Sequence, residues 1–281
     1  MTAATYRVIS ARVRHQRDPL HRWYRRNEPT VLRVAGVVAF FVLWQVTSDV
    51  GMIDKFLFSS PRDILVAGAH EVTLPRFWND VRVSGVELGA GTLISVVIAV
   101  PLGIAIGWYR RVSLAADPWL NFTNALPRAA LVPLAVMWAG LGMEMKTLIV
   151  FLGGFFSVLL PTVDGVRTVE RQFVDVARSF RGSDLLILRS IVLPGVVPFI
   201  VSGLRILVGR VLAGVIIAEF YAITEGLGVM IYRSANSADQ ADRMFFGILI
   251  FTLLGIVGYE AVGVLDRYFQ RWRPALDTEE A

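Results

Sequence analysis

Six apolar segments constrain this chain more than any other feature of its sequence. A helix needs about 20 mostly apolar residues to cross the hydrocarbon core of a bilayer. The segments cover residues 31–51, 85–108, 126–141, 145–166, 196–221 and 244–264. Prolines lie inside the second, third and fourth, and membrane helices tolerate them where neighbouring helices satisfy the freed backbone groups. The sequence therefore predicts an all-α membrane protein with six transmembrane helices.

The composition excludes several classes of protein. Apolar residues make up 55% of the chain and charged residues 18%, whereas ordinary soluble domains have about 45–50% and about 25%. This balance excludes a disordered protein and a typical soluble enzyme. Because the chain has no cysteine, it is not a disulfide scaffold, an iron–sulfur protein or a thiolate zinc protein.

Motifs for catalysis are missing from the sequence as well. A P-loop requires a lysine in a glycine-rich turn, and neither of the two lysines, Lys55 and Lys146, lies in one. The three histidines are scattered and form no zinc-binding pair. We therefore expect a protein that is not an enzyme, that does not hydrolyse ATP by itself, and that needs no cofactor or metal.

Basic residues are distributed unevenly between the predicted loops. The chain has 28 lysines and arginines and a net charge of +5. With the N-terminus in the cytoplasm, 18 of them fall in cytoplasmic segments and seven in outer segments. Such a bias marks the cytoplasmic side, so we expect a multi-pass protein of the cell (inner or plasma) membrane with both termini in the cytoplasm. Charge in an apolar chain suits lipid headgroups, and we expect no nucleic-acid partner.

These features divide the chain into four predicted parts. A basic cytoplasmic tail occupies residues 1–33, and the first transmembrane helix with an extracytoplasmic segment occupies residues 34–83. A core of five transmembrane helices covers residues 84–268 and contains a cytoplasmic loop at 167–195. A second cytoplasmic tail covers residues 269–281.

The cytoplasmic loop is too charged to cross the membrane, yet its apolar residues recur at helical spacing. Two short helices that meet at Gly182 are expected to form a protrusion just inside the membrane. This protrusion is either a connector lying on lipid or a docking element for a soluble partner. The apolar face of its first helix consists of Phe173, Val176, Ala177 and Phe180.

The same loop resembles the signature of one protein family. Permeases of binding-protein-dependent ATP-binding-cassette importers carry the pattern Glu-Ala-Ala-x3-Gly-x9-Ile-x-Leu-Pro in a cytoplasmic loop. Asp175 takes the acidic position, and Arg181 stands where the family has its glycine, which follows here as Gly182. The other matching residues are Val176 and Ala177 at the two alanines, and Ile191, Leu193 and Pro194 at the end.

Five further stretches look like the nitrate, sulfonate and taurine branch of these permeases. They are residues 100–108, 126–142, 155–169, 193–210 and 218–231, and they follow one another in the family's order. One departure concerns Glu87, because that branch is expected to have an arginine at this place.

The resemblance implies a type I importer permease fold with a cytoplasmic coupling helix. It also implies two ATP-binding-cassette ATPase subunits, a second permease subunit (homodimer or heterodimer), an extracytoplasmic solute-binding protein and membrane lipid as partners. The permease would form the path for a small hydrophilic solute, such as a sulfonate, taurine or nitrate. The implied ATPase-docking residues are Asp175, Val176, Ala177, Arg178, Phe180, Arg181 and Gly182, and the implied end of the loop comprises Ile191, Leu193 and Pro194.

Two other classes of function stay open at this point. A polytopic membrane enzyme acting on lipid would need a clustered acidic or metal-binding site at one interface. A secondary transporter working as a single chain typically contains internal repeats. The sequence shows neither feature, and the ATP dependence of uptake would separate the classes.

Ionisable side chains inside the predicted helices are candidates for the pore or gate, because such groups usually face a cavity or a partner. Glu219 is either a gate residue bonded to loop backbone or an interfacial carboxylate reached by water. Arg210 either meets an anionic solute or bonds to neighbouring carbonyl groups. Glu87 is expected at a water-exposed rim. Arg205 is expected to extend its charged end to the cytoplasmic interface.

The second predicted helix carries two pairs of glycines spaced four residues apart. The pairs are Gly85 with Gly89 and Gly103 with Gly107. Small residues at this spacing let the backbones of two membrane helices approach closely. Both pairs are therefore expected at helix contacts.

Overall fold

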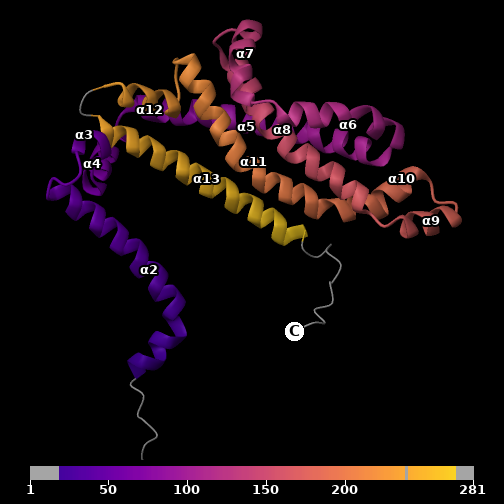
Figure 1. Ribbon diagram of the computed structural model, residues 1–281, viewed down its shortest axis with the longest axis horizontal. Helices are drawn as coiled ribbons and strands as arrows, with labels where there is room; N and C mark the ends of the chain where they lie inside the picture. Colours follow the sequence, from indigo (N-terminus) through magenta and orange to yellow (C-terminus); the bar gives the residue numbers. More distant parts are fainter. Residues whose placement is uncertain (1–18, 238–239, 270–281) are drawn as a thin grey trace, which may run out of the picture. The chain divides into compact units, whose positions relative to one another are not determined.

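The computed structural model describes residues 19–237 and 240–269, and within these ranges every regular element is a helix (Figure 1). Most of the predicted tail at 1–33 and nearly all of the tail at 269–281 lie outside the described residues. The chain separates into two compact units, Met1–Asp63 and Ile64–Ala281, each of which is described by itself.

The first unit contains α2 (Pro19–Asp49), α3 (Lys55–Phe58) and the start of α4 (Pro61–Glu71). Over residues 32–46, exposed apolar side chains lie on all sides of α2, with Phe40 at 61% and Leu43 at 65%. A helix that is apolar all round is stable where lipid or protein surrounds it. The Ser60 hydroxyl caps α4, because it accepts a hydrogen bond from the backbone N–H of the third residue of the helix at 3.1 Å.

The second unit is built around α8 (Met143–Thr168). This helix packs along α5 (Pro75–Trp108) and along α11 (Leu193–Ala222) (Figure 1). Two further helices, α12 (Leu227–Ala235) and α13 (Ala241–Phe269), pack against each other and against α11. In the second unit, α5 and α11 therefore share α8 as a partner, and α13 is attached through α11 and α12.

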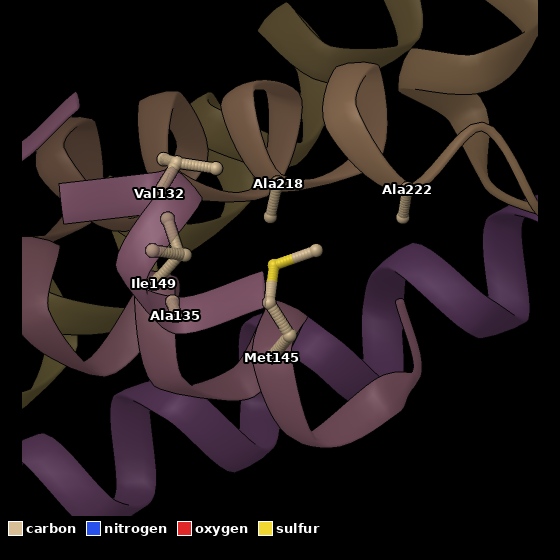
Figure 2. Packing of buried hydrophobic residues seen from close by; sticks show 6 residues of the cluster. All are labelled: Val132, Ala135, Met145, Ile149, Ala218 and Ala222. Carbon is tan, nitrogen blue, oxygen red and sulfur yellow. The ribbon is translucent and has the colours of Figure 1, made fainter. Parts of the chain in front are cut away.

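A buried apolar cluster marks one end of this arrangement. Figure 2 shows side chains from α7 (Val132–Ala139), α8 and α11 pointing toward one another. Met145 is the largest of them and is fully buried. The cluster consists of Val132, Ala135, Met145, Ile149, Ala218 and Ala222.

Five of the described helices are long and apolar enough to cross a membrane. They overlap five of the six predicted segments. The chain is therefore a multi-pass membrane protein by length and composition of its helices. The five helices are Asn27–Asp49, Pro75–Trp108, Met143–Thr168, Asp184–Ala222 and Ala241–Phe269.

The third predicted segment, residues 126–141, is not one spanning helix. It is divided into the short 3-10 helix η1 (Arg128–Leu131) and α7, which has eight residues. Leu126 is extended, at φ −68° and ψ 130°, because the proline that follows it disfavours helical backbone. Gly140 then ends α7 at φ +71°. The prediction of a single spanning helix here is wrong, because the helical residues of this segment lie between Leu126 and Gly140 and are divided into η1 and α7.

The broken segment nevertheless runs the length of α8, together with α6 (Arg110–Ala125). Asp117 of α6 pairs at 2.6 Å with Arg167, near the end of α8. Val132 and Ala135 of α7 pack on the start of α8. α6, η1 and α7 thus lead from one end of α8 to the other.

Glycines let α5 approach α8 closely. A Cβ atom on Gly103 would lie 2.8 Å from Thr162 Cβ, and one on Gly107 would lie 2.5 Å from Val166 Cβ. The predicted close contact at this pair is confirmed. Gly85 and Gly89 have no described atom within 4 Å of such a Cβ position, so the prediction for this pair is wrong.

We expect Gly103→Ala to destabilise the protein and Gly89→Ala to leave it as stable or more stable. Both substitutions gain about 0.8–1 kcal/mol of helix propensity, and only the first places a methyl group against α8. Overpacking of this kind costs about 1–3 kcal/mol. The temperature of unfolding of the purified protein in detergent measures the difference. Equal unfolding temperatures for the two variants would show that α5 and α8 are not closely packed at Gly103.

Candidate functional site

The loop predicted to be cytoplasmic forms a short protruding helix, α9 (Arg171–Ser179), followed by α10 (Asp184–Ile187) and the π-helical turn η2 (Leu188–Val192). Ser183 caps α10, because its hydroxyl accepts a hydrogen bond from the N–H of Leu186 at 3.3 Å. From Asp184 the chain continues in helical form into α11. The second predicted segment of the loop is thus the start of a spanning helix.

The end of α9 shows how the chain turns although Arg181 stands at the glycine position of the signature and the glycine follows as Gly182. Arg181 has φ +57°, so it occupies the left-handed conformation that glycine usually takes at this place. Its N–H donates to Arg178 O at 2.8 Å, and the N–H of Gly182 donates to Ala177 O at 2.9 Å. This pair of bonds is a Schellman motif. The left-handed residue of this turn is therefore Arg181, and Gly182 follows it.

Gly182 is required at its position for a different reason. A Cβ atom there would lie 2.8 Å from Ala177 O, the carbonyl that its own N–H bonds. The left-handed conformation costs a residue with a Cβ about 1–2 kcal/mol. The Ala177 carbonyl oxygen therefore leaves no room for a side chain at residue 182, and the hydrogen bonds of the motif hold Arg181 in the left-handed conformation.

The turn leaves apolar side chains of the loop exposed. Phe180 is 85% exposed, and Phe173 and Val176 are 53% and 56% exposed. Contiguous exposed apolar groups mark sites of interaction with protein or membrane. Across the turn, Arg178 pairs with Asp184 at 3.6 Å.

A cavity of about 550 Å³ lies between α9 and the start of α11. It brings the two parts of the signature together, because Val176 and Ala177 line it from α9 and Ile191 and Pro194 line it from the loop end. Leu193, in the same stretch, is half-buried. A second cavity of about 640 Å³ next to it is lined by Asp175 and Arg178.

A buried polar cluster lies at the other end of α8 and α11. Glu219, near the end of α11, is fully buried and accepts hydrogen bonds from the Ser84 hydroxyl and from the N–H of Gly228. The Ser84 oxygen in turn accepts a hydrogen bond from the N–H of Leu227 at 2.9 Å. Glu219 was expected either to bond to loop backbone or to be reached by water. The structure shows a buried carboxylate that bonds to backbone at the start of α12.

Glycines stand just before α12 and in its first turn because the Glu219 carboxylate occupies the space that a side chain would need there. A Cβ atom on Gly228 would lie 2.7 Å from Glu219 Oε2. Gly226 has φ +131°, which side chains rarely allow, and a Cβ there would overlap the same carboxylate. Gly226 also donates its N–H to Asp80 Oδ1 at 2.9 Å. The start of α12 is therefore fixed to α5 and α11 by backbone hydrogen bonds.

An ion pair completes the cluster. Lys146 Nζ lies 2.8 Å from Glu87 Oε1, and both side chains are buried. Lys146 also donates to the carbonyl oxygen of Glu225 at 2.7 Å, and Asn79 donates to the carboxylate of the same residue at 3.1 Å. The expectation that Glu87 lies at a water-exposed rim is wrong, because Glu87 is on the face of α5 that packs on α8.

Sequence reasoning missed Asp80, Ser84 and Lys146. Asp80, Ser84 and Glu87 recur at the three- and four-residue spacing of one helix face. The buried small residues of α5 continue this face, at Gly91, Ser95, Ala99 and Gly103. This periodicity in the sequence could have predicted that Glu87 is buried.

The two arginines of α11 have different surroundings. Arg205 pairs with Asp266 of α13 at 2.6 Å and lies over the ring of Tyr259, 5.8 Å from its centroid. Arg205 was expected only to extend its charged end to the cytoplasmic interface, and neither of these two partners was predicted. Arg210 is exposed and lines a cavity of about 480 Å³ between α8, α11 and η1. Glu87 and Glu219 are not among the described residues that line this cavity.

Within the described ranges, no three His, Asp or Glu side chains come together in a way that could hold a metal ion. The described part of the site therefore consists of an exposed helix, a buried hydrogen-bond network and a cavity that Arg210 lines.

Comparisons with known proteins agree with this architecture. A protein of Escherichia coli K12 named as an aliphatic sulfonates transport permease protein, SsuC, is 29% identical over 265 residues, which cover 94% of this chain and 98% of that protein. Its namesake in Bacillus subtilis 168 is 28% identical over 82% of this chain and 83% of that protein. The taurine transport system permease protein TauC of E. coli K12 is 26% identical over 92% of this chain and 95% of that protein.

A family profile gives the assignment. Residues 99–271 match the profile described as "Binding-protein-dependent transport system inner membrane component". This range covers the third predicted segment, the loop that contains α9, and the polar cluster's contributions from α8, α11 and α12. The resemblance to ATP-binding-cassette importer permeases of the sulfonate and taurine branch is confirmed. The chain belongs to the family of inner-membrane components of binding-protein-dependent transport systems, whose members are transport permeases and not enzymes.

Proposed function

We propose that this chain is the permease subunit of an ATP-driven importer and forms the path for a small hydrophilic solute. An extracytoplasmic binding protein would deliver the solute, and partner subunits would hydrolyse ATP. Family membership supports this role over a secondary transporter or an enzyme acting on lipid. The names of the relatives support a solute of the sulfonate or taurine kind.

The observation that carries the proposal is the α9 segment. It extends past the end of α8 and exposes an apolar face whose most exposed side chain is Phe180, at 85%. Asp175 and Arg178 add charges beside that face. We propose that α9 docks on an ATPase subunit and that the Schellman turn at Arg181 and Gly182 holds the docking face in position.

We further propose that α6, η1 and α7 together form the sixth crossing of the membrane. They lead from one end of α8 to the other, and 16 and eight helical residues reach about 36 Å at 1.5 Å per residue. That length spans a hydrocarbon core of about 30 Å. Six crossings place both termini on one side, and the basic residues favour the cytoplasm.

The cavity between α8, α11 and η1 supports a permease made of two such chains. Pro127, Ala129, Arg210 and Ala213 line the cavity and are exposed, so one chain does not enclose it. A second permease subunit would close the path. We propose a homodimer, in which the same face of each copy contributes.

The polar cluster suits a role at the outer end of the path. It lies at the opposite end of α8 from α9, about 39 Å away for a helix of 26 residues. In Figure 1, α12 and α9 accordingly lie at opposite ends of α11. We propose that Glu219 and its partners hold the loop before α12 as part of the extracytoplasmic gate.

Replacing Phe180 by aspartate is expected to disrupt docking on the ATPase. Loss of an aromatic anchor at an interface costs about 2 kcal/mol or more, which is about a 30-fold weaker complex. Co-purification of the ATPase with the permease, and ATP-dependent uptake into vesicles, measure the loss. Asp175→Lys is expected to act in the same direction.

The control for this experiment is Phe180→Leu, which keeps an apolar side chain on the exposed face. It should retain most of the complex. Assembly and uptake that stay normal in both Phe180→Asp and Asp175→Lys would rule out α9 as the docking segment.

Ser84→Ala is expected to destabilise the outer end of the protein. It removes the donor to Glu219 and leaves the buried N–H of Leu227 without its acceptor, and an unsatisfied buried group costs about 1–3 kcal/mol. Ser95→Ala is the matched control on the same helix, because Ser95 donates only to carbonyl oxygens. Unfolding temperature and uptake rate measure both variants. If Ser84→Ala were no more harmful than Ser95→Ala, the cluster would not hold this loop.

A further inference from the structure

The membrane-spanning part of α11 carries an arginine without a described counter-ion. Arg205, five residues before it, has Asp266 and the Tyr259 ring as partners. Arg210 makes no hydrogen bond or ion pair with the side chains and backbone groups that the structure describes. A charged side chain within a spanning segment is costly unless it faces water or a partner.

The cavity beside Arg210 provides the place for such a partner. Of its described lining residues, Arg210 is the charged one, and the others are apolar or glycine. They are Leu126, Pro127, Ala129, Ile149, Gly153, Ala213, Gly214 and Ile217. A cation in an apolar, partly water-filled cavity attracts an anion more strongly than it would in bulk water.

The carboxylate nearest along the same helix does not fill this role. Glu219 is nine residues further on, which is about 13.5 Å along the axis. It is fully buried and bonded to Ser84 and Gly228 in the polar cluster. Arg210 is thus available to a charge that enters from outside the chain.

Glycines let α8 pack closely against α11 beside Arg210. A Cβ atom on Gly153 of α8 would lie 3.1 Å from Arg210 O, so α8 and α11 touch through their backbones at this level. Gly214, one turn after Arg210, is likewise closer to α8 than a side chain would allow, with its Cβ position 3.2 Å from Val150 Cα. Beyond these contacts the wall of the cavity consists of small and apolar groups.

We propose that Arg210 binds the anionic group of the transported solute and that this cavity selects small anions over cations. The proposal rests on the proposed role of the chain as a permease. It adds a specific residue and a charge class, which the names of the relatives do not assign to any residue. A guanidinium matches a sulfonate or carboxylate through paired N–H donors.

The absence of cysteine from the chain permits a direct test. Ala213→Cys places one thiol on the cavity wall, three residues from Arg210 and on the same helix face. In membrane vesicles containing the full-length chain, this thiol is treated with sulfonatoethyl methanethiosulfonate, an anion, or with trimethylammonioethyl methanethiosulfonate, a cation. Each reagent reacts with the same thiolate, so the ratio of the two rates cancels any change in the reactivity of the thiol.

With Arg210 present, the anionic reagent should react faster relative to the cationic one than it does in Arg210→Gln. The ratio should fall by about fivefold or more on this substitution, because a unit charge within several ångströms alters the local concentration of each reagent in opposite directions. Arg210→Lys should keep the ratio near that of the parent. Ethanesulfonate should slow the labelling with Arg210 and have no effect in Arg210→Gln.

Ser237→Cys, at an exposed position after α12, is the control site, and its ratio should not respond to Arg210→Gln. A ratio at Ala213→Cys that is the same with arginine and glutamine would overturn the proposal. So would a thiol that neither reagent reaches, because the cavity would then be closed to ions. Failure of the permease role itself is recognised separately, as ethanesulfonate uptake into the vesicles that depends neither on ATP nor on the presence of the chain.

Discussion

The close contact of α8 with α5 and α11 is the constraint on which the rest of the structure depends. In lipid, apolar side chains gain little by leaving the solvent, so helix association relies on packing and on interhelical hydrogen bonds. Gly103 and Gly91 of α5, and Gly203 and Gly214 of α11, let the backbones approach α8 more closely than side chains would. The polar contacts at the ends of these helices depend on that approach.

The polar cluster follows from this contact. Once α5 and α11 lie against α8, Ser84, Glu87, Lys146 and Glu219 are brought together out of water. Burial of such groups is costly unless each finds a partner. The backbone N–H groups at the start of α12 supply partners for Glu219 and Ser84, so the loop that carries Gly226 is fixed at the same time.

At the other end of α8, most described side chains of α9 are exposed and not buried. There α9 makes few buried contacts and ends in a turn defined by local backbone hydrogen bonds, with Arg181 in the left-handed conformation. A local motif of this kind keeps its shape while its apolar face stays exposed. The proposed docking segment and the proposed gate thus lie at the two ends of α8, a helix of 26 residues.

The sequence by itself determined the membrane class, five of the spanning helices, the α9 segment and the family. Each of these is encoded locally, in the length of an apolar run, in helical periodicity or in the signature around Asp175 and Ala177. The third segment was misjudged, because Leu126, which precedes a proline, is extended and the helix that follows ends at Gly140.

Only the tertiary structure decided which ionisable groups are buried together and which arginine of α11 faces the cavity beside η1. Glu87 and Lys146 are 59 residues apart in sequence, and Ser84 and Glu219 are 135 apart. No local pattern relates such residues, since their pairing depends on how close α8 lets α5 and α11 come. The same packing leaves Arg210 at the cavity, while Arg205, on the same helix, meets Asp266 of α13.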